Sequence, residues 1–141
     1  MCTRWFKAAI IQSRHNKEIR PMHKAMSMDN AKVKACIEFC RSCEQACASS
    51  VAYCLGMGGR HAASEHITLL LDCARICATA GDFMVRGSEH QAHVCGACAE
   101  VCEACGKACE QFTDDSTMRR CADACRQCAK ACQEMAAMAT K

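Results

Sequence analysis

Cysteine is the residue of this chain whose number and spacing suggest chemistry. Seventeen of the 141 residues are cysteines, and most of them recur every three or four positions. In the densest stretch, CGACAEVCEACGKACE from Cys95 to Glu110, five cysteines follow one another at intervals of three, four, three and four residues. Thiolate sulfur is a strong ligand for soft metal ions. Reduced thiols at this density therefore predict a metal-binding protein.

The rest of the composition predicts that the cysteines lie on α-helices. The chain has one proline and seven glycines, too few for the many turns of a β-sheet protein. Alanine, glutamate, lysine, arginine and methionine are frequent, and all of them favour helix. An α-helix turns by about 100° per residue, so the five cysteines between residues 95 and 109 fall within an arc of about 80°. The thiols of each segment therefore share one helix face.

Helix start and stop signals divide most of the chain into four helices with short connections. Residues that favour an N-cap precede the first and the fourth helix, and a cluster of glycines follows the first. The helices are expected at about residues 29–55, 62–84, 89–111 and 116–139, with Asp29 or Asn30 capping the first and Asp115 or Ser116 the fourth. Four helices of similar length joined by short loops predict an all-α fold, the antiparallel up-down-up-down four-helix bundle.

Sixteen of the seventeen cysteines occupy the inward-facing positions of such a bundle. Charged residues of the same segments, such as Glu100 and Lys107, lie on the other faces. The sequence therefore predicts a cysteine-lined core that binds metal. Its ligands would be Cys36, Cys40, Cys43, Cys47, Cys54, Cys73, Cys77, Cys95, Cys98, Cys102, Cys105, Cys109, Cys121, Cys125, Cys128 and Cys132.

Two explanations of these cysteines without metal remain open. Buried free cysteine behaves as a small hydrophobic residue, so the thiols could belong to a structural or redox-sensing bundle. They could also form disulfides between helices, whereas neighbours on one helix are about 5–6 Å apart at Cβ, too far for the ~3.8 Å of a disulfide. Leucine or isoleucine would pack better at each of these positions, which favours a role for sulfur itself.

The repeated C-x-x-x-C pairs favour Cu(I) among the soft metals. Zinc takes four ligands in a tetrahedron, usually from a loop with C-x-x-C spacing, whereas a helix presents a row of thiols. Cu(I) accepts two or three sulfurs, so ions can share thiolates, and the load would be on the order of one ion per core thiol. The first alternative is an iron–sulfur electron carrier, although the C-x2-C-x3-C spacing from Cys95 differs from the ferredoxin run C-x2-C-x2-C-x3-C-P.

Four segments carry a resemblance to a known family: ACIEFCRSCEQAC, LDCARIC, CGACAEVCEACGKAC and RRCADACRQCAKAC. Over residues 30–139 the chain resembles the bacterial cysteine-rich four-helix-bundle copper storage proteins, and it looks like their cytosolic type. The resemblance implies that each bundle stores multiple Cu(I) ions, for copper storage and detoxification. It also implies that the bundles assemble into a homotetramer. It also implies a copper entrance lined by histidine and methionine at the end of the bundle that follows Cys54.

The expected topology brings Met57, His61, His66 and Met118 to that end of the bundle. Met57 follows Cys54 by about one helical turn, and His66 continues the cysteine stripe of the second helix within about 20°. Thioether and imidazole bind Cu(I) more weakly than thiolate does, which suits a relay. Met57, His61 and His66 are therefore candidate metal ligands, with solvated side chains as the alternative, and Met118 is expected to plug the bundle end.

The remaining methionines and the N-terminal region are expected to have other roles. Met84 and Met135 each follow a stripe cysteine by seven residues and are expected to close the opposite end of the bundle. Residues 1–28 are basic and contain Cys2 alone among the cysteines, so we expect a flexible or loosely docked extension ahead of a metal-storage domain at 29–141.

Several other classes of protein do not fit the sequence. The net charge of +3, a single Trp and a single Tyr argue against nucleic-acid binding. No apolar run approaches the ~20 residues of a membrane span, and the start of the chain lacks a secretory signal, so we expect a cytoplasmic protein. No set of nucleophile, base and acid stands apart from the thiols, so we expect no enzyme. Copper ions, delivered by a copper chaperone or a small-thiol donor, are the expected partners.

Overall fold

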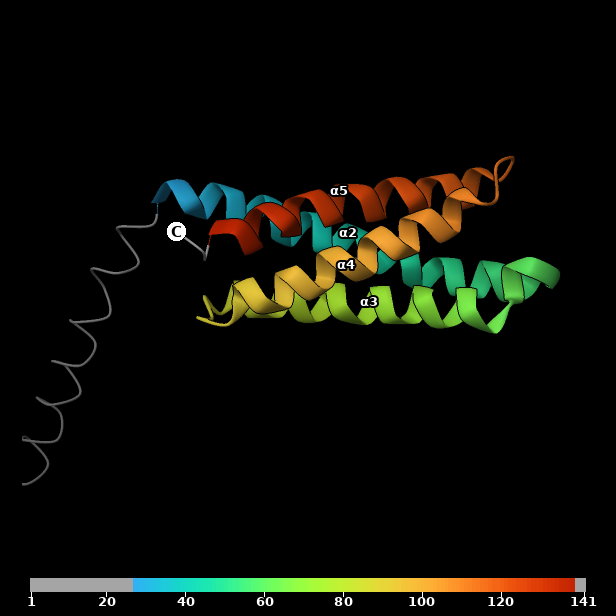
Figure 1. The fold of residues 1–141 in the computed structure, drawn as a ribbon, viewed down its shortest axis with the longest axis horizontal. Helices are drawn as coiled ribbons and strands as arrows, with labels where there is room; N and C mark the ends of the chain where they lie inside the picture. Colours follow the sequence, from blue (N-terminus) through green and yellow to red (C-terminus); the bar gives the residue numbers. More distant parts are fainter. Residues whose placement is uncertain (1–26, 139–141) are drawn as a thin grey trace, which may run out of the picture. The chain divides into compact units, whose positions relative to one another are not determined.

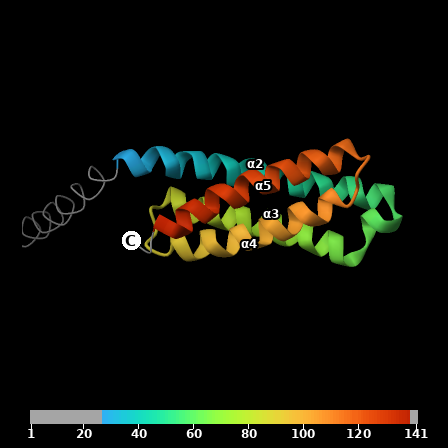
Figure 2. The same cartoon turned by 45° about the horizontal axis from the view of Figure 1, so that its top comes forward.

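The computed structural model describes residues 27–138, and the chain divides into two units, Met1–Lys32 and Val33–Lys141. The described residues form four α-helices, α2 (Ser27–Met57), α3 (Ser64–Val85), α4 (Gln91–Glu110) and α5 (Ser116–Met138), and a short 3-10 turn, η1 (Gly59–Ala62). From residue 33 onward these helices lie lengthwise side by side (Figure 1), and the turned view keeps them together (Figure 2). The expected antiparallel four-helix bundle is confirmed.

The expected helix ends lie within two residues of those in the structure, and the two ends of the first helix differ for local reasons. The first helix begins at Ser27, so neither Asp29 nor Asn30 is its cap. It also continues through Gly56 to Met57, because Gly56 keeps a helical backbone and the chain turns only at Gly58 and Gly59, which have φ 69° and 55°. The predicted extension, with Cys2 and the residues up to 26, lies outside the described part of the chain.

The start of α5 is set by Asp115. One carboxylate oxygen of Asp115 accepts hydrogen bonds from the backbone N–H of Thr117 at 2.9 Å and of Met118 at 3.0 Å. The backbone carbonyl of Asp115 accepts the next N–H, that of Arg119, at 3.0 Å. Asp115 is therefore an N-cap in the usual geometry, as the sequence predicts.

Two of the three connections between helices, those before and after α3, turn at glycines with positive φ. At the end of α3, the N–H of Ser88 bonds to the carbonyl of Phe83 and the N–H of Gly87 bonds to that of Met84. Gly87 has φ 63°, a backbone conformation that costs glycine least. This turn reverses the chain into α4.

Sulfur fills most of the interior of the bundle. The sixteen described cysteines are each between 0 and 1% exposed, and Leu70 and Met118 are the largest fully buried side chains. Small residues let α4 and α5 approach closely: a Cβ added at Gly106 would lie 3.5 Å from the Cβ of Cys125. None of the helices in residues 27–138 is long and apolar enough to cross a membrane.

Candidate metal centre

The buried thiols form one continuous column along the bundle. All sixteen described cysteines are free, and every helix contributes to the column. Cys77 of α3 and Cys102 of α4 have sulfurs 3.5 Å apart, and Cys40 of α2 and Cys128 of α5 have sulfurs 3.6 Å apart. Because these contacts join different helices, the thiols of separate stripes share one interior.

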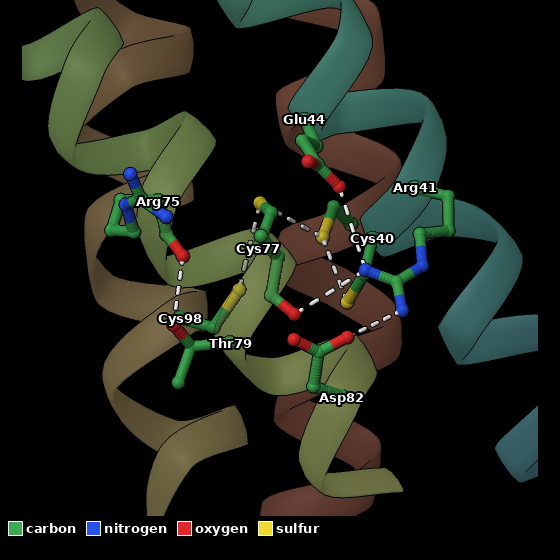
Figure 3. A network of polar contacts seen from close by, with 10 residues as sticks. Cys40, Arg41, Glu44, Arg75, Cys77, Thr79, Asp82 and Cys98 are labelled. Carbon is green, nitrogen blue, oxygen red and sulfur yellow. Dashed lines mark hydrogen bonds and ion pairs between the residues drawn. The ribbon is translucent and has the colours of Figure 1, made fainter. Parts of the chain in front are cut away.

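Figure 3 shows how the column is separated from solvent. Cys40, Cys77 and Cys98 point into the space between the helices, and the polar side chains lie outside. On that outer side Arg41 donates to a carboxylate oxygen of Asp82 at 2.7 Å and to the backbone carbonyl of Ala78 at 3.3 Å. These contacts join α2 to α3 without placing a charge among the thiols.

Groups of thiols are close enough to share a metal ion. In each group the sulfur atoms all lie within 4.8 Å of one another. Among the described residues the groups are Cys40, Cys98, Cys128 and Cys132; Cys43, Cys73, Cys77 and Cys102; Cys43, Cys47, Cys73 and Cys125; Cys77, Cys98, Cys102 and Cys128; and the trio Cys36, Cys95 and Cys132. The groups overlap, so a thiolate of one group can bridge to an ion in the next.

The column ends in a mixed set of donors near the start of α3. The sulfur of Cys54 lies 3.6 Å from Nε2 of His66 and 3.7 Å from the thioether sulfur of Met118. Burial raises the pKa of the Cys54 thiol to about 11. Burial also lowers the pKa of His66, so its imidazole is neutral at neutral pH. A thiol, a neutral imidazole and a thioether together suit a Cu(I) ion held less tightly than in the column.

His66 connects this donor set to a surface cavity. The cavity has a volume of about 290 Å³, and its lining includes Arg60, His66, Leu69 and Phe112. Because His66 is 8% exposed and also contacts Cys54, its ring spans the short distance between the cavity and the thiols.

A second layer of side chains covers the same end of the bundle. His61 contacts one carboxylate oxygen of Asp115 through Nε2 at 2.8 Å, and the hydroxyl of Tyr53 donates to that oxygen, also at 2.8 Å. The ring of Phe112 lies between the two histidines, with centroids 4.1 Å from His61 and 5.0 Å from His66. This layer ties the η1 turn to the ends of α2 and α4 and to the start of α5.

The carboxyl group of Asp115 stays ionised in this layer. Burial would raise its pKa, but the backbone N–H of Met118, the side chains of His61 and Tyr53 and the N–H of Thr117 together lower the pKa to about 2. The charged form accepts four hydrogen bonds, and this outweighs the burial.

The structure brings together most of the residues predicted for the site. The cysteines and His66 lie in the column or against it. His61 lies in the outer layer, where its imidazole is paired with Asp115. Met57 is 54% exposed and so lies outside the buried donor set. Met118 does fill the bundle end, as expected, and its thioether also faces Cys54.

The sequence does not predict that Tyr53 and Phe112 belong to this end of the site. It also does not predict the contact between Asp115 and His61. Asp115 was predicted only as a helix cap. No spacing rule joins Tyr53 to a residue 62 positions further along the chain. The pattern FTDDS after Glu110 is the only local signal, and it indicates a turn rather than a cover for the thiols.

At the opposite end the column is closed by apolar side chains. Cys36 and Cys132, whose sulfurs lie 3.7 Å apart, form the last thiol group together with Cys95. Met84 and Met135 are 3% and 5% exposed, as expected for residues that close this end. The column therefore ends at a buried histidine beside a surface cavity on one side and at apolar side chains on the other.

The chain is similar to proteins of one family. A family model described as copper storage protein, Csp, matches residues 29–137. The Nmul_A1745 protein of Nitrosospira multiformis is 42% identical, with a TM-score of 0.73 over 77% of this chain and 98% of that one. The Cu(I)-bound copper storage protein BsCsp3, whose apo form is described from Bacillus subtilis, is 39% identical, with a TM-score of 0.70 over 74% and 98%. A cytosolic copper storage protein of Streptomyces lividans, solved with five coppers, is 34% identical, with a TM-score of 0.73 over 79% and 97%. No curated protein matches the sequence.

Proposed function

Because this chain belongs to the copper storage protein family, we propose that it binds and stores many Cu(I) ions through cysteine thiolates inside the bundle, for copper storage and detoxification. The observation that carries the proposal is the column of sixteen free, buried thiols with contributions from all four helices. Soft thiolates select Cu(I), and sulfurs 3.5–4.0 Å apart allow one thiolate to serve two neighbouring ions.

Charge balance favours a monovalent ion in this interior. A buried thiolate without a partner is costly, and the buried residues within the described part of the chain include no lysine or arginine to offset it. Each Cu(I) that displaces one thiol proton leaves the core neutral, so the load can grow along the column without accumulating charge. The expected capacity is therefore on the order of one ion per core thiol.

A titration of the metal-free, reduced protein tests the proposal. Cu(I) is added anaerobically against a chromophoric Cu(I) chelator after the thiols have been counted. We expect the chelator to stay unloaded until the number of ions per chain approaches the number of core thiols. Saturation at one or two ions per chain would reject storage. The same result would favour a structural or redox-sensing bundle.

The iron–sulfur alternative is not favoured by the site. Clusters of that kind take their cysteines from loops, whereas the described thiols lie on continuous helices. The reduced, copper-loaded protein is expected to be colourless because Cu(I) thiolates do not absorb visible light. A brown protein would contradict this.

The end of the bundle near His66 is the proposed entrance for copper. His66 would accept Cu(I) from the cavity and pass it to Cys54, with Met118 as the third donor. Met57 and His61 remain proposed weak ligands, Met57 through its exposed thioether and His61 once it leaves Asp115. All sixteen cysteines of the column are the proposed storage ligands.

We further propose the setting of this store. It would lie in the cytoplasm, act as a non-enzymatic binding protein and assemble as a homotetramer, and a copper chaperone or small-thiol donor would deliver its copper. The relative from Streptomyces lividans, described as cytosolic, supports the first of these points. Residues 1–28 are proposed to be an extension ahead of the storage domain at 29–141, and the match of the family model to residues 29–137 is consistent with that boundary.

A further inference from the structure

Two of the thiol groups approach a tetrahedral arrangement of sulfurs. In the group of Cys43, Cys47, Cys73 and Cys125, five of the six sulfur–sulfur distances lie between 3.7 and 4.0 Å. In the group of Cys77, Cys98, Cys102 and Cys128, four of the six lie between 3.5 and 3.8 Å. Each group takes its sulfurs from three helices.

This size matches a four-coordinate ion of the zinc type. A Zn²⁺–sulfur bond of about 2.3 Å requires tetrahedral sulfurs about 3.8 Å apart. The sulfurs of both groups already lie near that separation without a metal, so an ion at the centre of either group needs little movement of the helices. A single helix offers only a row of thiols, and the tetrahedron appears only when α2, α3, α4 and α5 are packed together.

The overlaps between the groups limit how many such ions fit. Among the described residues there are four groups of four thiols, and three overlaps join them. One pair of groups shares Cys43 and Cys73, and the other pair shares Cys98 and Cys128. One group of each pair also contains Cys77 and Cys102, so at most two of the four groups can be filled at once. Because one thiolate set cannot complete two separate tetrahedra, each pair holds one ion, and the chain holds two.

The thiols around each group can stabilise the negative charge of the complex that forms when such an ion binds. Binding one divalent ion releases four thiol protons to solvent and forms a tetrathiolate complex with net charge −2. Neighbouring thiols that keep their protons can donate S–H bonds to the ligands: Cys105 and Cys121 lie 3.9 and 3.8 Å from Cys47, and Cys40 lies 3.6 Å from Cys128. Such outer hydrogen bonds orient and stabilise metal ligands.

We propose that, in the absence of copper, the core binds two divalent ions with a preference for tetrahedral thiolate coordination, of which Zn²⁺ is the type, one in each pair of overlapping groups. Cu(I) displaces them, because it binds thiolate more strongly and leaves the interior neutral. The divalent ions would thus occupy the core until copper arrives. The binding of divalent ions does not depend on copper storage, since it concerns the copper-free protein and a different class of ion; the displacement step rests on the proposed function.

Co²⁺ is a direct probe of the proposal, because four-coordinate Co²⁺ thiolate has intense visible bands that six-coordinate Co²⁺ lacks. The full-length, metal-free, reduced protein is titrated with Co²⁺ without oxygen, and Zn²⁺ is then added. We expect the tetrathiolate spectrum to saturate at two Co²⁺ per chain, four protons to be released per ion, and Zn²⁺ to bleach the bands. A weak six-coordinate spectrum, or continued uptake beyond two ions, would overturn the proposal.

Serine substitutions locate the two sites. Cys73→Ser removes both members of one pair and Cys98→Ser both members of the other, so each variant should bind one Co²⁺ and the double variant none. The control Cys54→Ser/Cys109→Ser alters two buried thiols outside all four groups and should still bind two. If a variant loses its helical circular dichroism, Cys43→Ser and Cys128→Ser replace it, since they remove the same pairs. Equal binding by all variants would refute the assignment.

Displacement is measured separately. Cu(I) is added to the protein loaded with two Zn²⁺, and the released zinc is read with a chromophoric zinc chelator. We expect both ions to leave before the copper capacity is filled. Retention of zinc at full copper load would contradict the displacement, while the Cu(I) titration of the metal-free protein decides storage on its own.

Discussion

The Nε2 atom of His66 lies 3.6 Å from the thiol sulfur of Cys54, at the point where the thiol column meets the surface cavity. Cys54 is fully buried, and its raised pKa of about 11 keeps the thiol protonated at neutral pH. The neutral imidazole of His66 has a ring nitrogen available to hold an incoming ion beside that thiol. The pair is therefore suited to start the exchange of a proton for a copper ion.

His66→Gln is expected to slow copper loading without emptying the store. The variant removes the imidazole and leaves the column intact, so the capacity should fall by at most one ion. If one hydrogen-bond-sized interaction of about 1.4 kcal/mol is lost in the loading step, the rate falls by about tenfold. Stopped-flow absorbance of thiolate–copper bands on mixing with Cu(I) measures the rate.

The control for this experiment is His90→Gln at the exposed start of α4. It should load at the rate of the unaltered protein. Equal rates for both variants and the parent would remove His66 from the entry step.

Asp115→Ala is expected to destabilise the fold by about 1–2 kcal/mol, the usual cost of losing an N-cap. The carboxylate accepts hydrogen bonds from the backbone N–H groups of Thr117 and Met118 and also contacts the side chains of His61 and Tyr53. Chemical denaturation of the metal-free, reduced protein measures the difference in the free energy of unfolding. Asp114→Ala, an exposed neighbour, is the matched control and should change stability little.

The same residue predicts a dependence on acid. The folded-state pKa of Asp115, about 2, lies below the ordinary value of 3.8 for an aspartate. Its contribution is therefore complete above about pH 4 and disappears as the pH falls through about 2. The stability gap between the parent and Asp115→Ala should narrow over that range. A gap that stays constant down to pH 2 would show that the charge of Asp115 is not what stabilises the fold.

The helices and the thiol column could be predicted because the same spacing of cysteines along the sequence indicates both. Cysteines at three- and four-residue steps, as at 95, 98 and 102, can share a face only on a helix, and a face of that kind must be buried. The structure places these thiols at 0% exposure. Local capping chemistry likewise identified Asp115, because a cap is a contact between near neighbours in the chain.

The cover over the thiols could not be predicted for the opposite reason. Tyr53, His61 and Asp115 meet across three segments, and nothing in their spacing encodes that meeting. Met57 was expected beside Cys54 from helical periodicity, but it is 54% exposed at the last position of α2, where Gly58 turns the chain. The tetrahedral groups depend in the same way on the packing of helices against one another, which a single helical wheel does not contain.

Gly81→Ala tests the contact between Arg41 and α3 through two opposed effects. Alanine favours the helix interior over glycine by about 1 kcal/mol. A Cβ at residue 81 would lie 3.1 Å from the guanidinium carbon of Arg41 and would displace it from Asp82 and from the carbonyl of Ala78. The Arg41–Asp82 pair is exposed, so its loss offsets only part of that gain. Gly81→Ala should therefore raise the free energy of unfolding by less than the full gain of about 1 kcal/mol.

A double-mutant cycle separates these effects. In an Arg41→Ala background nothing is left to displace, so Gly81→Ala should stabilise the protein by up to about 1 kcal/mol. Thermal or urea denaturation measures the free energy of unfolding of the four proteins of the cycle. If Gly81→Ala has the same effect in both backgrounds, the two sites are not coupled, and the contact of Arg41 with α3 does not contribute to stability.

Copper binding is expected to weaken as the pH falls. The pKa of Cys54 is raised to about 11, so the first thiol an entering ion meets carries its proton throughout the neutral range. Binding must release that proton, and the apparent dissociation constant for an ion that displaces one proton should rise about tenfold for each unit by which the pH is lowered. Competition with a chelator whose own proton affinity is known measures this slope, and a pH-stat gives the protons released per ion.

Cys54→Ser is the control for the pH dependence. The first ion should then meet other thiols, so the loading rate should change while the pH slope of the dissociation constant for the remaining ions stays the same. A dissociation constant independent of pH would mean that the ions enter a core already ionised, which the burial of its thiols and the absence of lysine and arginine among its described buried residues do not allow.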